Sequence, residues 1–155
     1  QISVTIKGQG IIIGTPANLN LGSVNPGDTV EINFDDYFWV EDLRGTNTGH
    51  YTTIQCDGLY GPSNFVITGL QLSGATVEMI DGRTNNTLIY SNLSDRTDIT
   101  DPTLYLYRNN DLSNNGAINR YGNKPAIRVF VPEDAPAGSY KGKITYTLYD
   151  MSFNY

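Results

Sequence analysis

The sequence contains one histidine and one cysteine, the side chains that most often supply a catalytic base and a nucleophile. His50 and Cys56 are six residues apart, so on one strand they would share a face but lie roughly 20 Å from each other. A nucleophile must reach its base within hydrogen-bond distance. The spacing therefore argues against a catalytic pair, and no Gly-x-Ser-x-Gly turn is present. We expect Cys56 to be a buried strand residue.

Acidic residues could supply the two carboxylates of a glycosidase, and Asp and Glu together number 16. The nearest candidates combine Asp35 or Asp36 with Glu41 or Asp42, although acids in turns are usually just solvated. Zinc would need a thiol or imidazole cluster that the chain lacks. The oxygen ligands that could hold calcium, without a recognised loop pattern, are Asp98, Asp101, Asn109, Asn110 and Asp111. We predict no catalytic residue, no cofactor and no metal site.

Aromatic side chains are the other groups that could bind a ligand, since the chain has 11 Tyr and one Trp. A tyrosine at a surface combines an apolar ring with a polar hydroxyl, so it can stack on a sugar or simply fill a sandwich edge. The candidate glycan contacts are Tyr37, Trp39, Tyr105, Tyr107 and Tyr121.

Alternation of apolar and polar residues predicts an all-β fold. It is clearest in residues 2–6, 29–34 and 140–148. Sixteen glycines and many asparagines supply frequent turns, and residues 109–123 are polar enough to predict a long loop. About ten such strands, spaced as in sandwiches, predict a two-sheet antiparallel sandwich of immunoglobulin-like or jelly-roll-like type.

The net charge of −6 disfavours nucleic-acid binding because an acidic surface repels phosphate. No apolar run is long enough for a membrane span. The chain begins with Gln1 and is poor in Lys and Glu, which favours a mature, exported protein of a cell surface. Asn85 and Asn92 match the acceptor pattern for N-glycosylation.

The N-terminal segment is the most informative part of the sequence. Ile2, Val4 and Ile6 alternate with polar residues, and Ile11, Ile12 and Ile13 follow after Gly8-Gln9-Gly10. We expect residues 1–13 to form a strand segment and residues 14–155 a single domain. The strand could pair within its own sheet, or it could complete the sheet of another copy and so build a filament by donor-strand complementation.

Three further stretches resemble a known family. Tyr140-Lys141-Gly142-Lys143-Ile144-Thr145-Tyr146-Thr147-Leu148 is similar to the C-terminal signature of bacterial WxL domains, with Tyr146 at the position of the Trp. Asp42 and Arg44-Gly45 fit the stretch before the first motif of that family, where Tyr51-Thr52-Thr53 replaces Trp-x-Leu. Leu21 to Gly27 resembles the family's entry strand and turn.

The resemblance implies a secreted β-sandwich of the cell surface and attachment to the cell wall. The N-terminal strand and the missing catalytic groups also resemble pilin-like subunits of extracellular filaments. We therefore predict a non-enzymatic structural subunit that assembles with copies of itself. The alternative is a module that binds cell-wall polysaccharide or another glycan.

Overall fold

The computed structural model of the chain describes residues 10–44, 48–74, 76–82, 89–91, 96–108 and 119–150. Regular structure in these ranges consists of strands and one 3-10 turn, η1 (Pro62–Asn64). All pairs between these strands are antiparallel. The predicted all-β class is therefore confirmed. None of the described residues belongs to a helix that could cross a membrane.

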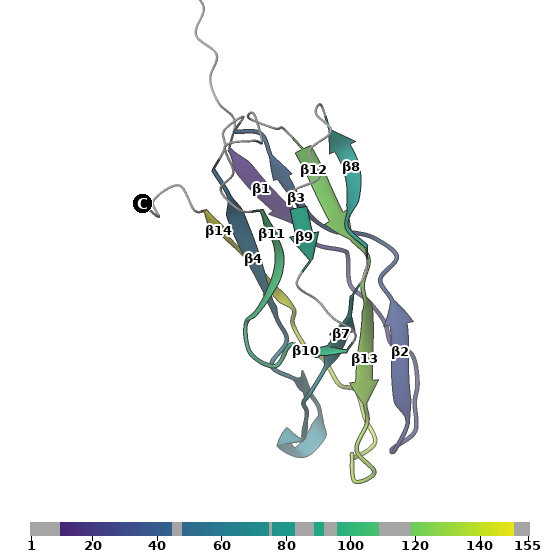
Figure 1. The fold of residues 1–155 in the computed structure, drawn as a ribbon. Coiled ribbons are helices and arrows are strands. Elements are labelled where there is room, and N and C mark those ends of the chain that lie inside the picture. Colours follow the sequence, from purple (N-terminus) through teal and green to yellow (C-terminus); the bar gives the residue numbers. More distant parts are fainter. Residues whose placement is uncertain are drawn as a thin grey trace, which may run out of the picture.

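The first layer of the fold is built around two long, bent strands that pair with each other. Strand β2 (Thr29–Asn33) continues into β3 (Phe38–Asp42), and β12 (Asn119–Asn123) continues into β13 (Ala126–Phe130). β3 pairs with β12, and β2 pairs with β13. Because both strands bend at the same level, the sheets above and below the bend form one layer (Figure 1).

Shorter strands widen this layer on both sides. β7 (Gln71–Ser73) pairs with β13, and β8 (Glu78–Gly82) pairs with β12. β1 (Ile11–Gly14) borders β3, and β10 (Thr97–Asp98) borders β7. The resulting orders are β1-β3-β12-β8 above the bend and β10-β7-β13-β2 below it.

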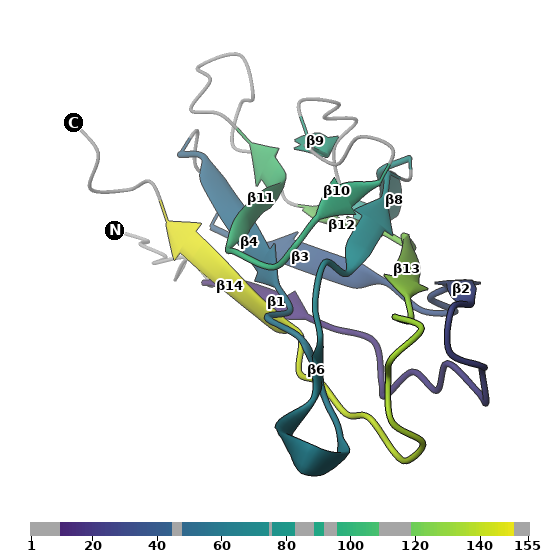
Figure 2. The same ribbon diagram turned by 90° about the horizontal axis from the view of Figure 1, so that it is seen from below.

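The second layer, which we call sheet C, has the order β14-β4-β11-β9. Its central strands are β4 (His50–Gln55) and β11 (Thr103–Arg108), and its edges are β14 (Thr145–Asp150) and β9 (Ile89–Ser91). A small hairpin of β5 (Leu59–Tyr60) and β6 (Val66–Ile67) extends from the end of β4. Figures 1 and 2 show β14 and β1 at the same side of the molecule.

The core lies between the two layers, as expected for a sandwich. Strict alternation in β3 and β4 turns every second side chain inward, including Phe38, Val40 and Ile54. Aromatic rings interlock across the layers: the centroid of Phe38 lies 5.8 Å from that of Tyr105 and 5.6 Å from that of Tyr146. Cys56 is buried in this core, as predicted.

Two strand predictions were wrong in detail. Residues 119–123, expected in a long loop, form β12 in the middle of the first layer, because Tyr121 is buried and Gly122 lets the strand approach Phe38 closely. The alternating stretch 140–148 becomes a ladder strand only from Thr145, although Tyr140 and Ile144 still pack on the core.

β1 spans the expected boundary between residues 13 and 14, so Ile11–Gly14 belongs to the sandwich.

The packing of Phe38 gives a test of this core. Phe38→Ala should lower the free energy of unfolding by about 3–5 kcal/mol, because it removes a buried ring that contacts both layers. Phe130→Ala is the matched control, since Phe130 is 58% exposed, and should change it by less than about 0.5 kcal/mol. Urea denaturation of the three proteins would measure both effects, and equal losses would contradict the assigned core.

Candidate functional site

A cluster of buried charged and polar side chains lies at one end of the sandwich. Asp42 is the last residue of β3, Arg108 is the last of β11 and His50 is the first of β4. All three are at most 1% exposed. In the ladders of sheet C, His50 is the partner of both Arg108 and Asp150, so strand ends of both layers meet here.

The Asp42 carboxylate is the centre of this cluster. Arg44 donates from Nε to Asp42 Oδ1 (3.0 Å) and from Nη2 to Asp42 Oδ2 (2.9 Å), a two-pronged contact that matches the carboxylate geometry. The backbone N–H of Arg44 also donates to Asp42 Oδ1 (3.1 Å), and Arg108 Nη1 donates to Asp42 Oδ2 (3.2 Å). Burial alone would raise the pKa of Asp42, but the neighbouring His50 and Arg44 hold it well below its usual range.

Arg44 connects the cluster to the second layer. Its Nη1 donates to Asp150 Oδ1 of β14 (2.6 Å), and its Nη2 donates to the backbone oxygen of Thr48 (2.9 Å). Among the described residues of the cluster, the two arginines and the two aspartates balance in charge when His50 is neutral. A protonated His50 would add an uncompensated positive charge to a buried site, which is unfavourable.

The His50 ring is held between Asp42 and Tyr121. Its Nε2 is hydrogen-bonded to the Tyr121 hydroxyl, and its Nδ1 lies 3.6 Å from Asp42 Oδ2 without a hydrogen-bond partner among the described residues. Burial lowers the pKa of His50, the Asp42 carboxylate offsets this only in part, and Arg44 and Arg108 lower it further. His50 is therefore neutral near pH 7.

This cluster is suited to holding the two layers together rather than to acting on a substrate. The imidazole is fully buried, and its Nε2 is already bonded to Tyr121. Cys56 follows directly after the opposite end of β4, and burial raises the pKa of its thiol, which disfavours the reactive thiolate. The structure thus keeps the only His and the only Cys apart, as the spacing predicted.

In the proposed carboxylate pairs, the second members Glu41 and Asp42 are both engaged by arginines. Asp42 is buried against Arg44, whereas Glu41 points to the other face of β3 and forms an ion pair with Arg120 (3.2 Å). Of the calcium candidates, Asp98 accepts a hydrogen bond from the backbone of Thr100. The described residues contain no cluster of His, Cys, Asp and Glu that could hold a metal ion.

Two of the predicted glycan contacts are wrong. Tyr105 and Tyr121 are at most 1% exposed, because both lie on the inward-facing side of their strands, where they cannot reach a ligand outside. The Tyr105 hydroxyl donates to Asn123, and burial raises its pKa. The hydroxyl of each of these two tyrosines is thus hydrogen-bonded inside the core.

Tyr37 and Trp39 are half-buried on the outer side of the first layer, where cations cover them. The Trp39 ring lies over Gly14 of β1, where a Cβ would overlap it, and the guanidinium of Arg120 stands 4.4 Å from the ring centroid. The ammonium of Lys124 lies 4.6 Å from the centroid of Tyr37. The nearby carboxylate of Glu78 raises the pKa of the Tyr37 hydroxyl. These rings are held by contacts within the chain.

The fifth candidate, Tyr107, belongs to a surface feature that the sequence analysis missed. Tyr149 of β14 is the ladder partner of Tyr51 of β4, and Tyr51 is the partner of Tyr107 of β11. The rings of Tyr51 and Tyr149 stack, with centroids 4.8 Å apart and planes 10° apart. These three residues, the tyrosine row, are 42 and 56 residues apart in sequence, so only the register of sheet C could reveal them.

The N-terminal candidates divide between described and undescribed residues. Ile11, Ile12 and Ile13 pair with Asp42, Glu41 and Val40, respectively, of their own chain. Ile11 and Ile13 pack against the core, and Ile12 is half exposed. These three therefore occupy a strand of their own sandwich. Ile2, Val4 and Ile6, and the acceptor sites Asn85 and Asn92, lie outside the described residues.

Comparison with protein-family models, curated proteins and solved structures finds no match for this chain. The resemblance to WxL domains and pilin-like subunits therefore stays a prediction.

The neutral, buried His50 predicts a pH-dependent stability. Below about pH 6.5 the unfolded chain binds a proton at His50 that the folded chain resists, so the free energy of unfolding should fall as the pH drops. His50→Gln removes this titration and should give a flatter curve between about pH 7.5 and 5. Below about pH 4 both proteins should lose stability, because the unfolded chain then binds a proton at Asp42 that the folded chain, with its lowered Asp42 pKa, resists.

Urea denaturation across this pH range would measure the free energy of unfolding of both proteins. The contributions of the other carboxylates are the same in both and cancel in the difference. NMR titration of the single histidine would give its pKa in the folded state directly. Parallel stability curves, or a pKa at or above 6.5, would contradict the assignment.

Proposed function

We propose that this protein is a non-enzymatic, extracellular structural subunit whose copies associate when the N-terminal strand of one adds to the sheet of the next. The observation that carries the proposal is the open edge of sheet C. Among the described residues β14 pairs with β4 on one side, and no described strand pairs with its other side. Such an edge is a template for a further strand.

The sequence of β14 lacks the devices that usually block edge pairing. Residues 145–149 carry no charge and no proline, and the charged Asp150 comes only at the end. The other edge strands carry a charged residue or are short: β2 contains Glu31, β8 contains Glu78, and β1 has four residues. In the described part of the chain, β14 is therefore the edge strand with the longest run of uncharged residues.

The N-terminal sequence is a suitable partner for this edge. Ile2, Val4 and Ile6 would face the core side, where Tyr146 and Ile144 are only partly buried, and the polar residues between them would face outward. Because residues 11–14 are anchored in the sandwich, the donor segment is limited to residues 1–9. A contact that joins the front of one copy to the edge of another repeats head to tail and produces a filament.

Removal of residues 1–9 should abolish assembly, whereas removal of Ile11–Ile13 would also strip β1 from the fold. Val4→Asp should act like the deletion, because it places an unpaired charge on the buried side of the donor. Thr5→Asp, on the opposite side, is the matched control. Negative-stain electron microscopy and sedimentation velocity would compare the four proteins. Filaments that persist in the deletion variant, or an unassembled full-length chain, would contradict the proposal.

The acceptor edge can be tested from its own side. Thr145→Lys combined with Thr147→Lys should block assembly, because lysines on an edge strand disfavour further pairing. Thr53→Lys is the matched control, since Thr53 is the ladder partner of Thr147 but lies on the interior strand β4. The same microscopy should show filaments only for the control, and equal assembly of both variants would place the acceptor elsewhere.

A further inference from the structure

We propose that the outer face of sheet C binds a chain of uncharged sugars along the tyrosine row Tyr149–Tyr51–Tyr107. This site uses the face of the sheet rather than the edge of β14. It goes beyond strand addition, and its test does not depend on assembly. It also differs from the glycan contacts predicted from sequence, of which it retains only Tyr107.

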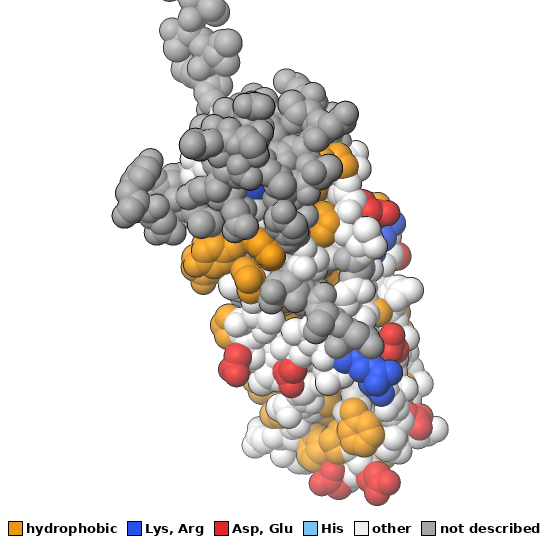
Figure 3. Space-filling view, viewed as in Figure 1, with side chains coloured by type: hydrophobic (Ala, Val, Ile, Leu, Met, Phe, Trp, Pro, Cys, Tyr) orange, Lys and Arg blue, Asp and Glu red, His pale blue; other side chains and the backbone are white. Residues whose placement is uncertain are grey.

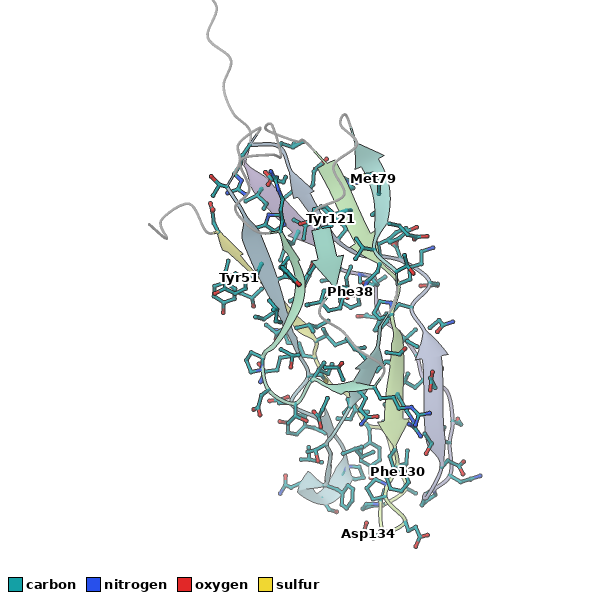
Figure 4. The ribbon with its side chains drawn as sticks, in the orientation of Figure 1. Phe38, Tyr51, Met79, Tyr121, Phe130 and Asp134 are labelled. Atoms are coloured by element: carbon teal, nitrogen blue, oxygen red, sulfur yellow. The ribbon has the colours of Figure 1, made fainter. Side chains whose placement is uncertain are left out.

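The ladder places the row on the outside of the sandwich. In β4, His50, Thr52 and Ile54 are buried, whereas Tyr51 and Thr53 between them are partly exposed. In β14, Tyr146 packs on Phe38 and Tyr105, so Tyr149 points the other way and is 42% exposed. Figure 3 shows a hydrophobic patch over β14 and β4, at the place where Figure 4 labels Tyr51.

Charge is missing from this part of the sheet. The outward positions described on β14, β4 and β11 hold tyrosine, threonine, glutamine and leucine, with Thr147 opposite Thr53 and Thr53 opposite Leu104. The chain as a whole carries a net charge of −6, and the charged ends Arg108 and Asp150 are committed to the internal cluster. An ionic ligand would find no counter-charge at these described outward positions, which favours a neutral ligand.

The chemistry of the row matches the two kinds of surface on a sugar. Tyr51 and Tyr149 use one face of each ring in their mutual stack, so the C–H groups of a pyranose can pack against the ring surface that remains, and the ring hydroxyls can bond to the sugar's hydroxyls. The neighbouring Thr147 and Thr53 add two more hydroxyls. The stacked Tyr51 and Tyr149 hold each other in place, so little side-chain entropy is lost on binding.

The dimensions of the row favour a polymer over a single sugar. Three neighbouring strands at about 4.8 Å spacing place the outer tyrosines about 10 Å apart. An open face contacts its ligand from one side only, so affinity must come from several sugars along one chain.

Affinity electrophoresis in gels that contain hydroxyethylcellulose or galactomannan would test this proposal, with a polymer-free gel and polygalacturonate as references. The full chain should be retarded by at least one neutral polymer and not by the anionic one. Tyr149→Ala should weaken this binding about tenfold, and the triple variant with Tyr51→Ala and Tyr107→Ala should lose it. Phe130→Ala, an exposed aromatic on β13, is the matched control and should bind normally.

Circular dichroism would confirm that each variant is folded, and Tyr149→Phe should keep most of the binding because the ring remains. Absence of retardation in both neutral gels would overturn the proposal, as would retardation by polygalacturonate alone. Unchanged binding by the folded triple variant would do the same. If the tyrosine substitutions altered only self-association in sedimentation velocity, the row would be a contact between copies, and the saccharide site would be wrong.

Discussion

The Asp42 carboxylate is buried between the layers, and a buried charge is tolerated only when its partners are also buried and hydrogen-bonded. Arg44 and Arg108 are these partners, and both donate hydrogen bonds to Asp42. Arg44 also donates a hydrogen bond to Asp150. Loss of one partner of such a group typically costs about 3–5 kcal/mol. The cluster therefore fixes how the ends of β3, β4, β11 and β14 align. Because the cluster fixes these strand ends, sheet C has a single register.

The register set at this end decides which residues face outward. A shift of one residue in β14 would exchange Tyr149 with its inward-facing neighbour and place polar threonines in the core. With Asp150 opposite His50, Tyr149 falls opposite Tyr51, and the row follows. The same register leaves Tyr146 to complete the core with Phe38. The internal ion pairs and the external tyrosines are thus two results of one alignment.

The sequence predicted the all-β class and the positions of strands such as β2, β3 and β13, because alternation is a local signal. It failed at β12, where Asn119, Gly122 and Asn123 look like a loop. There, Asn123 is in fact buried and bonded to Tyr105. The buried cluster was also missed. His50 stands in a glycine-rich connection in the sequence, and its neighbours Arg108 and Tyr121 are 58 and 71 residues away. Partners so distant in sequence become visible only when strand order and register are known.

The two outer faces of the sandwich differ in a way that bears on function. On the first layer, Trp39 and Tyr37 are covered by Arg120 and Lys124, so their aromatic surface is occupied by the chain's own cations. On sheet C, the outward tyrosines have only uncharged described neighbours in the ladder. Cations over aromatic rings reduce the apolar surface that Trp39 and Tyr37 can offer to other molecules, whereas Tyr51 and Tyr149 stack on each other. Because β14 belongs to this same sheet, a strand added at its edge would widen the face that carries the row.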